Sequence, residues 1–513
     1  MDTMMGMFSK NLIYSQEKNY RHKPALIFEK TYTSYEELEH AANRFANFLS
    51  QKDIKGERIA FMLPNSVEII SIYLGCFKTG CIAMPINRRY AQPELERVLH
   101  DAEPYYLIIE EEKLFLLEDL NLAATRIKEV FVVGGNKTPN KYSLFQEIMN
   151  ASTEFQVSAL TNNNPAVIFY TSGSTGQPKG VVHTLNSIEA ILDTTSDALD
   201  TITAQDKIIV CEPQCHISGF METFSTLSRG GTVLVYDGFQ LDSYLEGLTK
   251  HRPTLAVPHI DTLMKLLDSG RCTSDTFASL RGVYTGGDVL PDSVQKRFIA
   301  CAGKPIHVGY GMTEGIWMAV CREENPKSGC IGKPLPGVQL RLVDKSGKEV
   351  AQGEDGEILV RGNILMLNYW HNPGESQKAF IDGWFKTGDS AKQDSQGIYY
   401  FSGRIKDIII RNTSNIMPGE VEAAIYQHPA IEAAGVIGIP DPHEGEVPVA
   451  FVVLKKGKKL TDAELSQYLT QFIAKYKIPV KIYFIEKIPL THSGKINHKK
   501  LYDFLPQAHS MGK

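Results

Sequence analysis

The sequence is poor in cysteine, carries no excess of positive charge and contains no long apolar run. Its 513 residues include 8 cysteines, and 54 Lys and Arg stand against 59 Asp and Glu, which gives a net charge of -5. A chain with this charge has no long-range electrostatic attraction for nucleic acid or for an anionic membrane. We therefore expect no nucleic-acid partner.

The cysteines are not arranged as a metal site or a disulfide framework. Cys76 and Cys81, and likewise Cys211 and Cys215, lack the C-x-x-C spacing, and no paired histidine motif lies near them. So few cysteines in a long chain favour reduced thiols packed in the core. We therefore expect neither a cysteine-bound metal nor a disulfide.

No segment has the character of a membrane span or of a secretion signal. The longest apolar runs, residues 69–77 and 433–439, are shorter than the roughly 18 residues that cross a bilayer. Residues 1–15 contain Asp2 and lack a basic start followed by an apolar core, unlike a signal peptide. The sequence thus predicts a cytoplasmic protein without a transmembrane segment, and peripheral contact with a membrane stays open.

The composition that remains is that of an ordinary globular protein. Hydrophobic residues make up 43%, charged residues 22% and aromatic residues 9% of the chain, which excludes disordered, collagenous and coiled-coil proteins. A chain of this length forms roughly three compact units, or two of which one is subdivided. No internal repeat or low-complexity tract interrupts it.

The first part of the chain alternates helical and strand-like patterns. Apolar residues at helical spacing over 35–48 and 67–78 flank a short strand at 58–63. Further strands are expected at residues 166–170, 208–211, 232–236, 255–257 and 282–284, and a helix follows each of the last four. This alternation indicates a layered α/β fold.

The pattern changes twice towards the C-terminus. Between about residues 329 and 401, short strands such as 338–343 and 356–360 are separated by Gly, Asp and Pro turns, which indicates a small β-rich unit. After residue 403 the chain reads as an α+β module, with helices expected over 420–427 and 462–475 and strands over 433–438, 447–454 and 481–486. We expect a domain boundary near Arg404.

Residues 170–180 have the composition of a phosphate-binding loop. They follow an apolar strand and offer backbone N–H groups, hydroxyl donors and one cation, which are the groups that hold a phosphate. The candidate contacts are Thr171, Ser172, Gly173, Ser174, Thr175, Gly176 and Lys179. Pro178 and Gly180 occupy positions that a Walker A loop needs for other residues, which argues against a P-loop kinase. The strand pattern of 180–183 further predicts that this loop joins two strands.

Residues 309–314, Gly-Tyr-Gly-Met-Thr-Glu, also suit a nucleotide. Gly311 permits close approach of a ligand to the backbone, and Tyr310 offers a flat face for a base. Thr313 supplies a hydroxyl for phosphate and Glu314 a carboxylate for magnesium. Asp389, after a Thr-Gly pair, is an acceptor suited to both ribose hydroxyls.

Seven motifs in order resemble those of the adenylate-forming superfamily, which includes acyl-CoA synthetases, carrier-protein adenylation domains and beetle luciferases. They occupy residues 170–180, 213–219, 285–287, 309–314, 383–389, 403–407 and 491–496, and the similarity extends from residue 35 to residue 501. The resemblance implies a fold and an activity. The expected fold is a large layered α/β domain, residues 1–402, with a small β-barrel-like subdomain at about 329–402. A hinge at 403–407 and a smaller mobile α+β lid domain, residues 408–513, follow it.

The resemblance also implies roles for single residues in binding ATP and Mg²⁺. Tyr310 stacks on adenine, Thr313 contacts the α-phosphate and Glu314 is the metal ligand. Asp389 binds the ribose, and Arg404 contacts ribose or phosphate. The loop 170–180 holds the phosphates.

Further roles concern the acid and the domain motion. Gly286 and Gly287 line the adenine and acyl sites, and His216 lines the carboxylate end of the acyl pocket. Lys495 bridges the substrate carboxylate and the α-phosphate, so a compact cation there stabilises the charge that develops during adenylation. Lys406 is the hinge residue about which the small domain turns.

The implied reaction activates a carboxylic acid with ATP and transfers the acyl group to CoA, giving acyl-CoA, AMP and pyrophosphate. Apolar pocket candidates favour a fatty or other hydrophobic acid, whereas His259 and Met312 admit something more polar. The apolar candidates are Phe220, Val257, Ile316 and Trp317. A bulky Trp317 shortens the pocket if it lines it, and it is equally compatible with a place in the core. The chain length of the acid stays open.

Departures from the family pattern leave alternatives. Residues 411–414 stand where relatives have a Gly-Gly pair, and the β-branched Thr413 tolerates a left-handed backbone poorly. The acceptor is therefore CoA or, alternatively, the phosphopantetheine of a carrier protein. A non-catalytic nucleotide-binding protein is the second alternative, and a homodimer is neither predicted nor excluded. Asp288 and His498 also depart from the family pattern, the first at the adenine end and the second in the closing motif.

Overall fold

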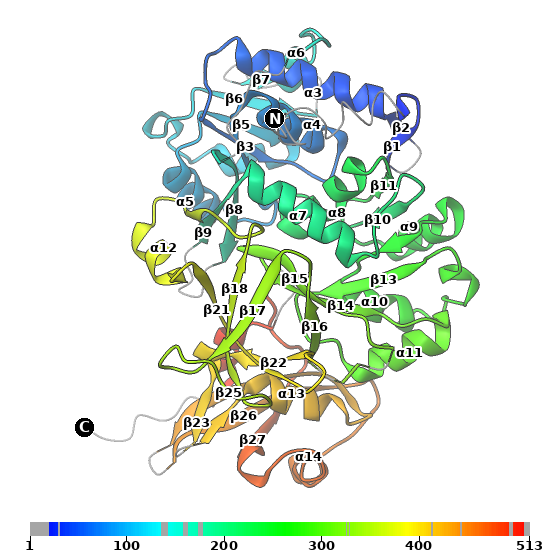
Figure 1. Cartoon of the computed structure of the whole chain (residues 1–513), viewed down its shortest axis with the longest axis vertical. Coiled ribbons are helices and arrows are strands. Elements are labelled where there is room, and N and C mark those ends of the chain that lie inside the picture. The colour runs from blue at the N-terminus through cyan, green and yellow to red at the C-terminus, as the bar shows by residue number, and fades with distance from the viewer. Residues whose placement is uncertain are drawn as a thin grey trace.

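The computed structural model describes most of the chain. It covers residues 20–28, 31–134, 142–156, 163–172, 178–324, 326–327, 329–411, 414–441, 444–491 and 496–506. A large part built from the first four fifths of the sequence stands above a smaller C-terminal part (Figure 1). This mixed α/β architecture with a large N-terminal and a smaller C-terminal domain is the predicted fold class.

One sheet of the large part has the order β19-β9-β8-β4-β3-β5-β6-β7. Its strands β3 to β6 are parallel, and β9 pairs antiparallel with both β8 and β19. The strands are β3 (Arg58–Met62), β4 (Ile82–Pro85), β5 (Tyr106–Glu110), β6 (Glu129–Val133), β7 (Ser143–Leu144), β8 (Pro165–Ser172), β9 (Pro178–Thr184) and β19 (Asn368–Tyr369). The prediction that the loop after β8 joins two strands is therefore confirmed.

A second, longer sheet follows the path β17-β18-β21-β22-β16-β15-β14-β13-β12-β10-β11-β1-β2, and β20 pairs with β21. The β-rich strands are thus continuous with the central sheet through the pairing of β15 with β16. The first strands along the chain are β1 (Pro24–Phe28), β2 (Thr31–Ser34), β10 (Lys207–Val210), β11 (Thr232–Val235), β12 (Leu255–Ala256), β13 (Gly282–Gly286), β14 (His307–Met312) and β15 (Gly315–Cys321). The others are β16 (Cys330–Pro334), β17 (Val338–Val343), β18 (Gly356–Gly362), β20 (Phe380–Ile381), β21 (Trp384–Gln393) and β22 (Tyr399–Arg404).

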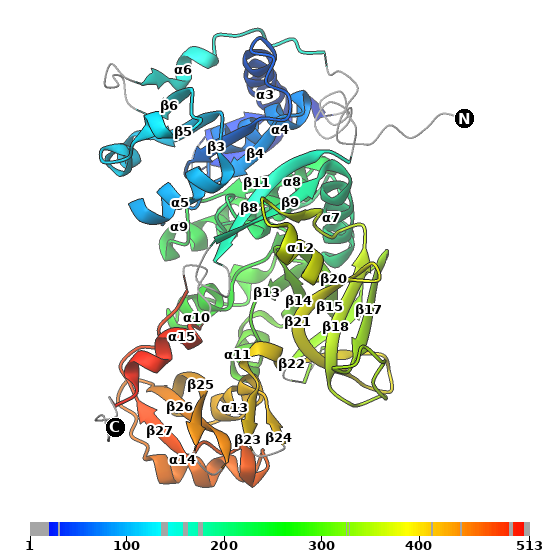
Figure 2. The ribbon, with the colours of Figure 1, turned by 90° about the vertical axis from the view of Figure 1, so that its left-hand side faces the viewer.

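Helices fill the space around and between these sheets (Figure 2). They are α3 (Tyr35–Ser50), α4 (Val67–Thr79), α5 (Gln92–Ala102), α6 (Phe145–Ile148), α7 (Leu185–Ala198), α8 (Ile217–Ser228), α9 (Leu241–Glu246), α10 (Ile260–Asp268), α11 (Asp292–Ala302) and α12 (Pro373–Ala379). The helices expected after β10, β11, β12 and β13 are present as α8, α9, α10 and α11. The largest core cluster joins both sheets to α3, α4, α7 and α8.

Aromatic packing fixes the position of α8 against its neighbours. Phe220 of α8 lies 5.0 Å from Tyr73 of α4 and 5.6 Å from Phe169 of β8, measured between ring centroids. Buried aromatic pairs at such separations contribute packing energy beyond the area that they bury. The strand that leads into the candidate phosphate loop is thereby held against the helix that begins after His216.

Local sequence signals explain where α3 begins. Ser34 caps α3: its hydroxyl accepts a hydrogen bond from the Glu37 N–H, and Glu37 accepts one from the Ser34 N–H. This reciprocal capping box satisfies N–H groups that a helix start leaves without a partner. The buried Tyr35 then donates to the carbonyls of Leu227 and Gly231, which ties α3 to the end of α8.

The C-terminal part is a five-stranded sheet with the path β24-β23-β26-β25 and with β27 beside β26. Its elements are β23 (Ile409–Arg411), β24 (Ser414–Ile416), α13 (Pro418–Tyr426), β25 (Ile431–Asp441), β26 (Gly445–Leu454), α14 (Asp462–Leu469), β27 (Lys481–Phe484) and α15 (His498–Leu501). The predicted helix over 462–475 is wrong in length, because α14 ends at Leu469. No residue between Leu469 and Pro479 is fully buried, so the chain beyond Leu469 has less apolar burial to support further helical turns.

One cysteine prediction is also wrong. Cys321 at the end of β15 and Cys330 at the start of β16 form a disulfide, and their Cα atoms are 6.1 Å apart. Their separation of 9 residues carries no recognisable pattern, and only the pairing of the two strands brings them together. The other six cysteines are free, as expected.

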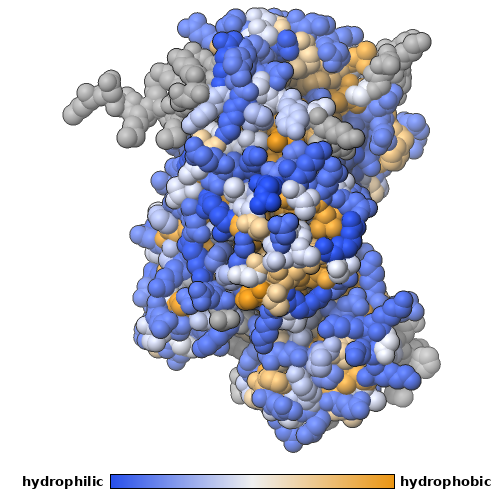
Figure 3. Space-filling view, turned by 90° about the vertical axis from the view of Figure 1, so that its right-hand side faces the viewer, coloured by the Kyte–Doolittle hydropathy of each residue, from blue (hydrophilic) through white to orange (hydrophobic). Residues whose placement is uncertain are grey.

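Hydrophilic residues predominate on the face in Figure 3, and hydrophobic residues lie there in scattered patches. Across the stretches of chain that the structure describes, no helix combines the length and apolar character needed to cross a bilayer.

A substitution of Gly332 tests the β15–β16 pairing. Gly332 has a φ of 78°, and a Cβ there would lie 1.9 Å from the Val320 carbonyl oxygen. We expect Gly332→Ala to cost roughly 3 kcal/mol or more, since a backbone clash adds to left-handed strain. Gly337 is a matched control, with a φ of 79° and no atom within 4 Å of its added Cβ. Gly337→Ala should cost only about 1 kcal/mol. Urea unfolding followed by tryptophan fluorescence compares the two, and equal shifts would contradict the predicted clash.

Candidate active site

The loop between β8 and β9 is framed by an antiparallel ladder. Thr171 lies opposite Lys179 in this ladder, and both strands belong to the sheet with the order β19-β9-β8-β4-β3-β5-β6-β7. Residues 173–176 and the side chain of Ser172 lie outside the described part of the chain. The structure therefore describes Thr171 and Lys179 among the predicted phosphate contacts.

Lys179 is held by the segment that follows β19. Its Nζ lies 2.5 Å from an Oε2 of Glu375 in α12 and 5.3 Å from the centre of the Tyr369 ring. The hydrogen bond from Lys179 lowers the pKa of the Glu375 carboxyl below its usual range. A lysine in this position is a fixed positive charge at the edge of the loop, available to an anion that displaces Glu375.

Glu314 contacts the hydroxyl of the same tyrosine. The Tyr369 hydroxyl donates to its Oε1 at 2.7 Å, and burial raises the pKa of that hydroxyl. The backbone of Glu314 is also held, since its carbonyl accepts a hydrogen bond from the Met366 N–H at 2.8 Å. Tyr369 thus places the carboxylate of Glu314 and the ammonium of Lys179 on one site.

Thr313 is positioned through the buried His183 of β9. The His183 Nε2 lies 2.8 Å from the Thr313 carbonyl oxygen, and Nδ1 lies 3.2 Å from the Ser187 hydroxyl. A carbonyl only accepts, so Nε2 carries the proton and Nδ1 accepts from Ser187. Burial lowers the pKa of His183 to about 4, which keeps the ring neutral near pH 7.

Tyr310, Asp389 and Arg404 come together from three strands. The Tyr310 hydroxyl donates to an Oδ2 of the buried Asp389 at 2.9 Å, and the Arg404 Nε lies 3.5 Å from Oδ1. Asp389 and Arg404 are direct partners in the β21–β22 ladder. The arrangement presents an aromatic ring, a carboxylate and a half-exposed guanidinium side by side.

The glycines of the central strands permit a close backbone approach. A Cβ on Gly286 would lie 2.8 Å from the Gly309 carbonyl oxygen, and Gly287 has a φ of 86°. A Cβ on Gly311 would lie 2.7 Å from the Trp317 backbone nitrogen. Each of the three positions therefore requires glycine.

Trp317 packs its indole against these glycines. A Cβ on Gly309 would lie 2.0 Å from the Trp317 ring, and the indole N–H lies 2.7 Å from the Met221 sulfur of α8. The ring also meets Tyr284 edge to face, with centroids 6.3 Å apart. Trp317 is buried and has a φ of 51°, an uncommon left-handed conformation for a bulky residue. It fills the space beside the glycine strands.

His216 precedes α8 as its N-cap residue and is partly buried. Burial lowers its pKa to about 4, and the neighbouring Glu212 carboxylate opposes that shift. Glu212 is itself bound by His259, whose Nε2 lies 2.7 Å from a Glu212 Oε2. Two histidines and a carboxylate thus gather between the end of β10 and the start of α8.

Lys495 lies outside the described residues, and so does the side chain of Lys406. Ile496, directly after Lys495, forms an isolated antiparallel bridge with Leu490. His498 is bound to Glu422 at 2.8 Å, and this hydrogen bond raises the pKa of His498 against the opposing effect of burial.

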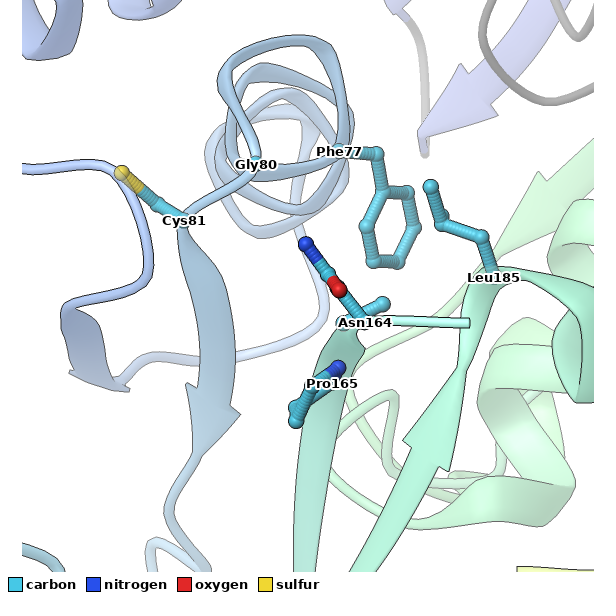
Figure 4. A pocket seen from close by; sticks show the side chains of 7 residues that line it. Phe77, Gly80, Cys81, Asn164, Pro165 and Leu185 are labelled. Atoms are coloured by element: carbon cyan, nitrogen blue, oxygen red, sulfur yellow. The ribbon is translucent and has the colours of Figure 1, made fainter. Parts of the chain in front are cut away.

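A separate pocket lies at the start of β8, at the opposite end of this strand from the candidate phosphate loop. It is lined by Phe77, Gly80, Cys81, Asn164, Pro165, Ala166 and Leu185. Figure 4 shows Phe77 and Leu185 pointing towards one another above Pro165, while Cys81 points away. None of the predicted site residues lines it.

Sequence reasoning missed four groups that the fold brings to the site: His183, Glu212, Tyr369 and Glu375. The apolar strand pattern concealed His183, and no local motif marks the other three. His259 was proposed only as a polar pocket residue. Each of these contacts joins segments that are distant in the sequence. No local sequence pattern therefore marks the residues that make them.

The donor set near Glu314 suits magnesium that arrives with a nucleotide. Among the residues that the structure describes, no three His, Cys, Asp or Glu side chains form a complete metal cage. Mg²⁺ is commonly held by one or two carboxylates together with substrate phosphates and waters, and Glu314 can supply such a carboxylate.

His183 makes stability depend on pH. Its pKa is about 4 in the folded protein against 6.5 in the unfolded chain, so the unfolded state binds more protons between these values. The stabilisation is complete above pH 6.5 and is lost as pH falls towards 4. We expect His183→Gln to reduce the slope of the unfolding free energy between pH 6.5 and 5 by up to about 1.4 kcal/mol per pH unit. Identical slopes for wild type and His183→Gln would refute the assignment.

Comparison with known proteins gives the family. The protein-family model of the AMP-binding enzymes matches residues 13–370. The family model of the AMP-binding enzyme C-terminal domain matches residues 420–495.

Similar proteins cover nearly the whole chain. The indoleacetate–CoA ligase of Aromatoleum aromaticum is 31% identical over 92% of this chain and 93% of its own length. The fatty acid–[acyl-carrier-protein] ligase ScoC of Streptomyces coeruleorubidus is 29% identical over 94% and 93%. The crystal structure of ATP-bound MatB from Rhodopseudomonas palustris superposes with a TM-score of 0.88 at 28% identity, over 97% and 99%. The chain therefore belongs to the AMP-binding enzymes of the adenylate-forming superfamily.

Proposed function

We propose that the protein is an ATP- and magnesium-dependent acid–thiol ligase that makes an acyl-CoA. In the first step a substrate carboxylate oxygen attacks the α-phosphorus of ATP, the bond to the β-phosphate breaks and pyrophosphate leaves. In the second step the sulfur of CoA attacks the acyl carbon, its proton is lost and AMP leaves. The products are acyl-CoA, AMP and pyrophosphate.

The observation that carries the proposal is that Lys179 and Glu314 both contact Tyr369, the first at its ring and the second at its hydroxyl. The hydroxyl of Tyr369 is 2.7 Å from Glu314, and its ring centre is 5.3 Å from the ammonium of Lys179. A cation for phosphate and a carboxylate for Mg²⁺ at one place suit a metal-bound polyphosphate. Bound magnesium supplies charge neutralisation for the departing pyrophosphate, and Glu314 is the residue that would hold it.

The nucleoside has a separate set of contacts. Tyr310 offers the face for adenine, Asp389 the carboxylate for the ribose hydroxyls, and Arg404 a cation for ribose or phosphate. The hydrogen bond between Tyr310 and Asp389 fixes both groups before the nucleotide enters. Thr313, Gly286, Gly287, Gly311 and the loop 171–176 complete the nucleotide site.

The acid and the domain motion involve the remaining residues. A neutral His216 lines the carboxylate end of the acid site, and Lys495 bridges the acid and the α-phosphate. Lys406 in the hinge 403–407 allows the C-terminal domain, residues 408–513, to withdraw Lys495 after adenylation. The acceptor thiol then reaches the acyl adenylate.

The names of the relatives support the class of reaction and leave a range of acids. One is named for indoleacetate and CoA, and another for a fatty acid and an acyl-carrier protein. We propose a hydrophobic acid, whether fatty or aromatic, and CoA as the acceptor. The second relative keeps a carrier-protein acceptor as the alternative. A cytoplasmic location stays a prediction of the sequence.

Pyrophosphate release across a panel of aliphatic and aromatic acids, with ATP and magnesium, tests the proposal. Acid-dependent release that CoA accelerates, with an acyl-CoA identified by mass spectrometry, is the expected result. Release without thioester would favour a carrier-protein acceptor. No release from any acid would overturn the ligase assignment.

Lys495→Ala is expected to lower acid-dependent pyrophosphate release by about a thousandfold and to leave ATP binding intact, because a charge-stabilising group contributes mainly in the transition state. Lys499→Ala, in α15 four residues further along the chain, is a matched control and should retain activity. ATP binding is followed by calorimetry. Unchanged release from Lys495→Ala would exclude the proposed role.

A further inference from the structure

Lys179, the proposed phosphate cation, is paired with a carboxylate of the protein itself. Its Nζ lies 2.5 Å from the Oε2 of Glu375, the third residue of α12. The side chain of Lys179 is 19% exposed and that of Glu375 is 36% exposed, so water reaches the carboxylate more readily than the ammonium. The hydrogen bond from Lys179 is the main cause of the lowered pKa of Glu375, which keeps this carboxyl group charged near pH 7. An anion that binds Lys179 therefore has to compete with Glu375.

The charges around Tyr369 disfavour a polyphosphate while Glu375 stays in place. Lys179 lies 5.3 Å from the centre of the Tyr369 ring, and Glu314 accepts from the Tyr369 hydroxyl at 2.7 Å. Glu375 binds the same lysine, so two carboxylates and one ammonium gather around one tyrosine. These three groups together carry a negative charge near pH 7. Movement of Glu375 away from Lys179 would therefore remove repulsion as well as competition, because a polyphosphate is itself strongly negative.

Glu375 has a second cation within reach. Its Oε1 accepts a hydrogen bond from the Lys378 Nζ at 3.1 Å, three residues further along α12. Lys378 is 78% exposed, so its long side chain is free to follow the carboxylate towards water. Glu375 would thus keep a cationic partner after it leaves Lys179. Ion pairs with this much exposure are also weak, which makes an exchange of partners easy.

The attachment of α12 to the rest of the protein does not depend on the Glu375 side chain. Every residue of this helix is at least partly exposed. Asn372 caps the helix, and its Oδ1 accepts from the backbone N–H of Glu375 at 3.1 Å. The Ser376 hydroxyl accepts from the Tyr369 N–H at 3.0 Å, which ties α12 to β19. The Glu375 side chain can therefore change rotamer while α12 and Tyr369 keep their positions.

We propose that Glu375 is a counter-ion of Lys179 that exchanges, in each turnover, with the phosphates of ATP that leave as pyrophosphate. This inference rests on the proposed function. When ATP binds, Glu375 turns to Lys378 and Lys179 takes up the phosphates. When pyrophosphate leaves, Glu375 returns to Lys179. The exchange weakens the binding of ATP and the rebinding of pyrophosphate alike, so it favours product release over substrate affinity.

Calorimetry with inorganic tripolyphosphate and Mg²⁺ tests the exchange without turnover. Glu375→Gln keeps the size of the side chain and removes its charge, and we expect it to bind tripolyphosphate about fivefold more tightly than the wild type. Glu246→Gln is the matched control, because it removes the same charge from a surface ion pair with Lys250 in α9 and the turn after it. Its affinity should equal that of the wild type.

Three results would overturn the proposal. Equal binding by Glu375→Gln and the wild type would show that Glu375 does not compete for Lys179. Weaker binding by Glu375→Gln would show that Glu375 positions Lys179 for the phosphate instead. Tripolyphosphate that binds to neither protein would show that Lys179 is not a polyphosphate contact.

A double-mutant cycle separates competition for Lys179 from a general effect of charge. Lys179→Met lacks the ammonium that Glu375 occupies. The gain in affinity from Glu375→Gln should therefore fall to less than about twofold when it is measured in Lys179→Met. An equal gain in both backgrounds would show that Glu375 acts on the ligand only through its charge, and would overturn the proposed exchange.

Product inhibition tests the return of Glu375 to Lys179. Added pyrophosphate should inhibit acyl-CoA formation by Glu375→Gln with an inhibition constant about fivefold lower than in the wild type, because the variant has no carboxylate to displace it. An unchanged inhibition constant would overturn this part of the exchange. If no acid supports turnover, the proposed function fails, whereas the binding of tripolyphosphate still decides whether Glu375 competes with an anion for Lys179.

Discussion

The antiparallel pairing of β9 with β8 on one edge and β19 on the other holds the candidate site together. Lys179 and His183 lie on β9, and Tyr369 lies on β19 opposite Val181. Through His183 the strand reaches the backbone of Thr313, and through Tyr369 it reaches the side chain of Glu314. Three segments that are distant in the sequence thus meet at the site: β9, β19 and residues 313–314. Their arrangement depends on the backbone hydrogen bonds of these strand pairs.

Charge pairing keeps this region stable in the absence of substrate. Lys179 is neutralised by Glu375, and the buried Asp389 accepts from Tyr310 and lies near Arg404. Buried charges need such partners, because removal from water is otherwise costly. The pairs are also exchangeable, since a phosphate can replace Glu375 at the lysine and ribose hydroxyls can use the remaining acceptor capacity of Asp389. The region is therefore already organised for the nucleotide that we propose.

Much of the fold was visible in the sequence, because hydrophobic periodicity is a local property. The strands and helices of the large domain, the loop between two strands and the order of the family motifs follow from residues close together in the chain. The length of α14 did not follow, because burial beyond Leu469 depends on what the other elements leave uncovered. The Cys321–Cys330 disulfide was missed for the same reason.

The sequence by itself determined the family, and it supplied the groups that we propose for the nucleotide, such as Tyr310, Glu314 and Asp389. Only the tertiary structure decided which groups pair with them. Tyr369 and Glu375 reach the loop because strands from distant segments pair, and Lys179 and Glu375 are separated by 196 residues in the sequence. Contacts between distant segments depend on the packing of whole elements, and no local pattern encodes them.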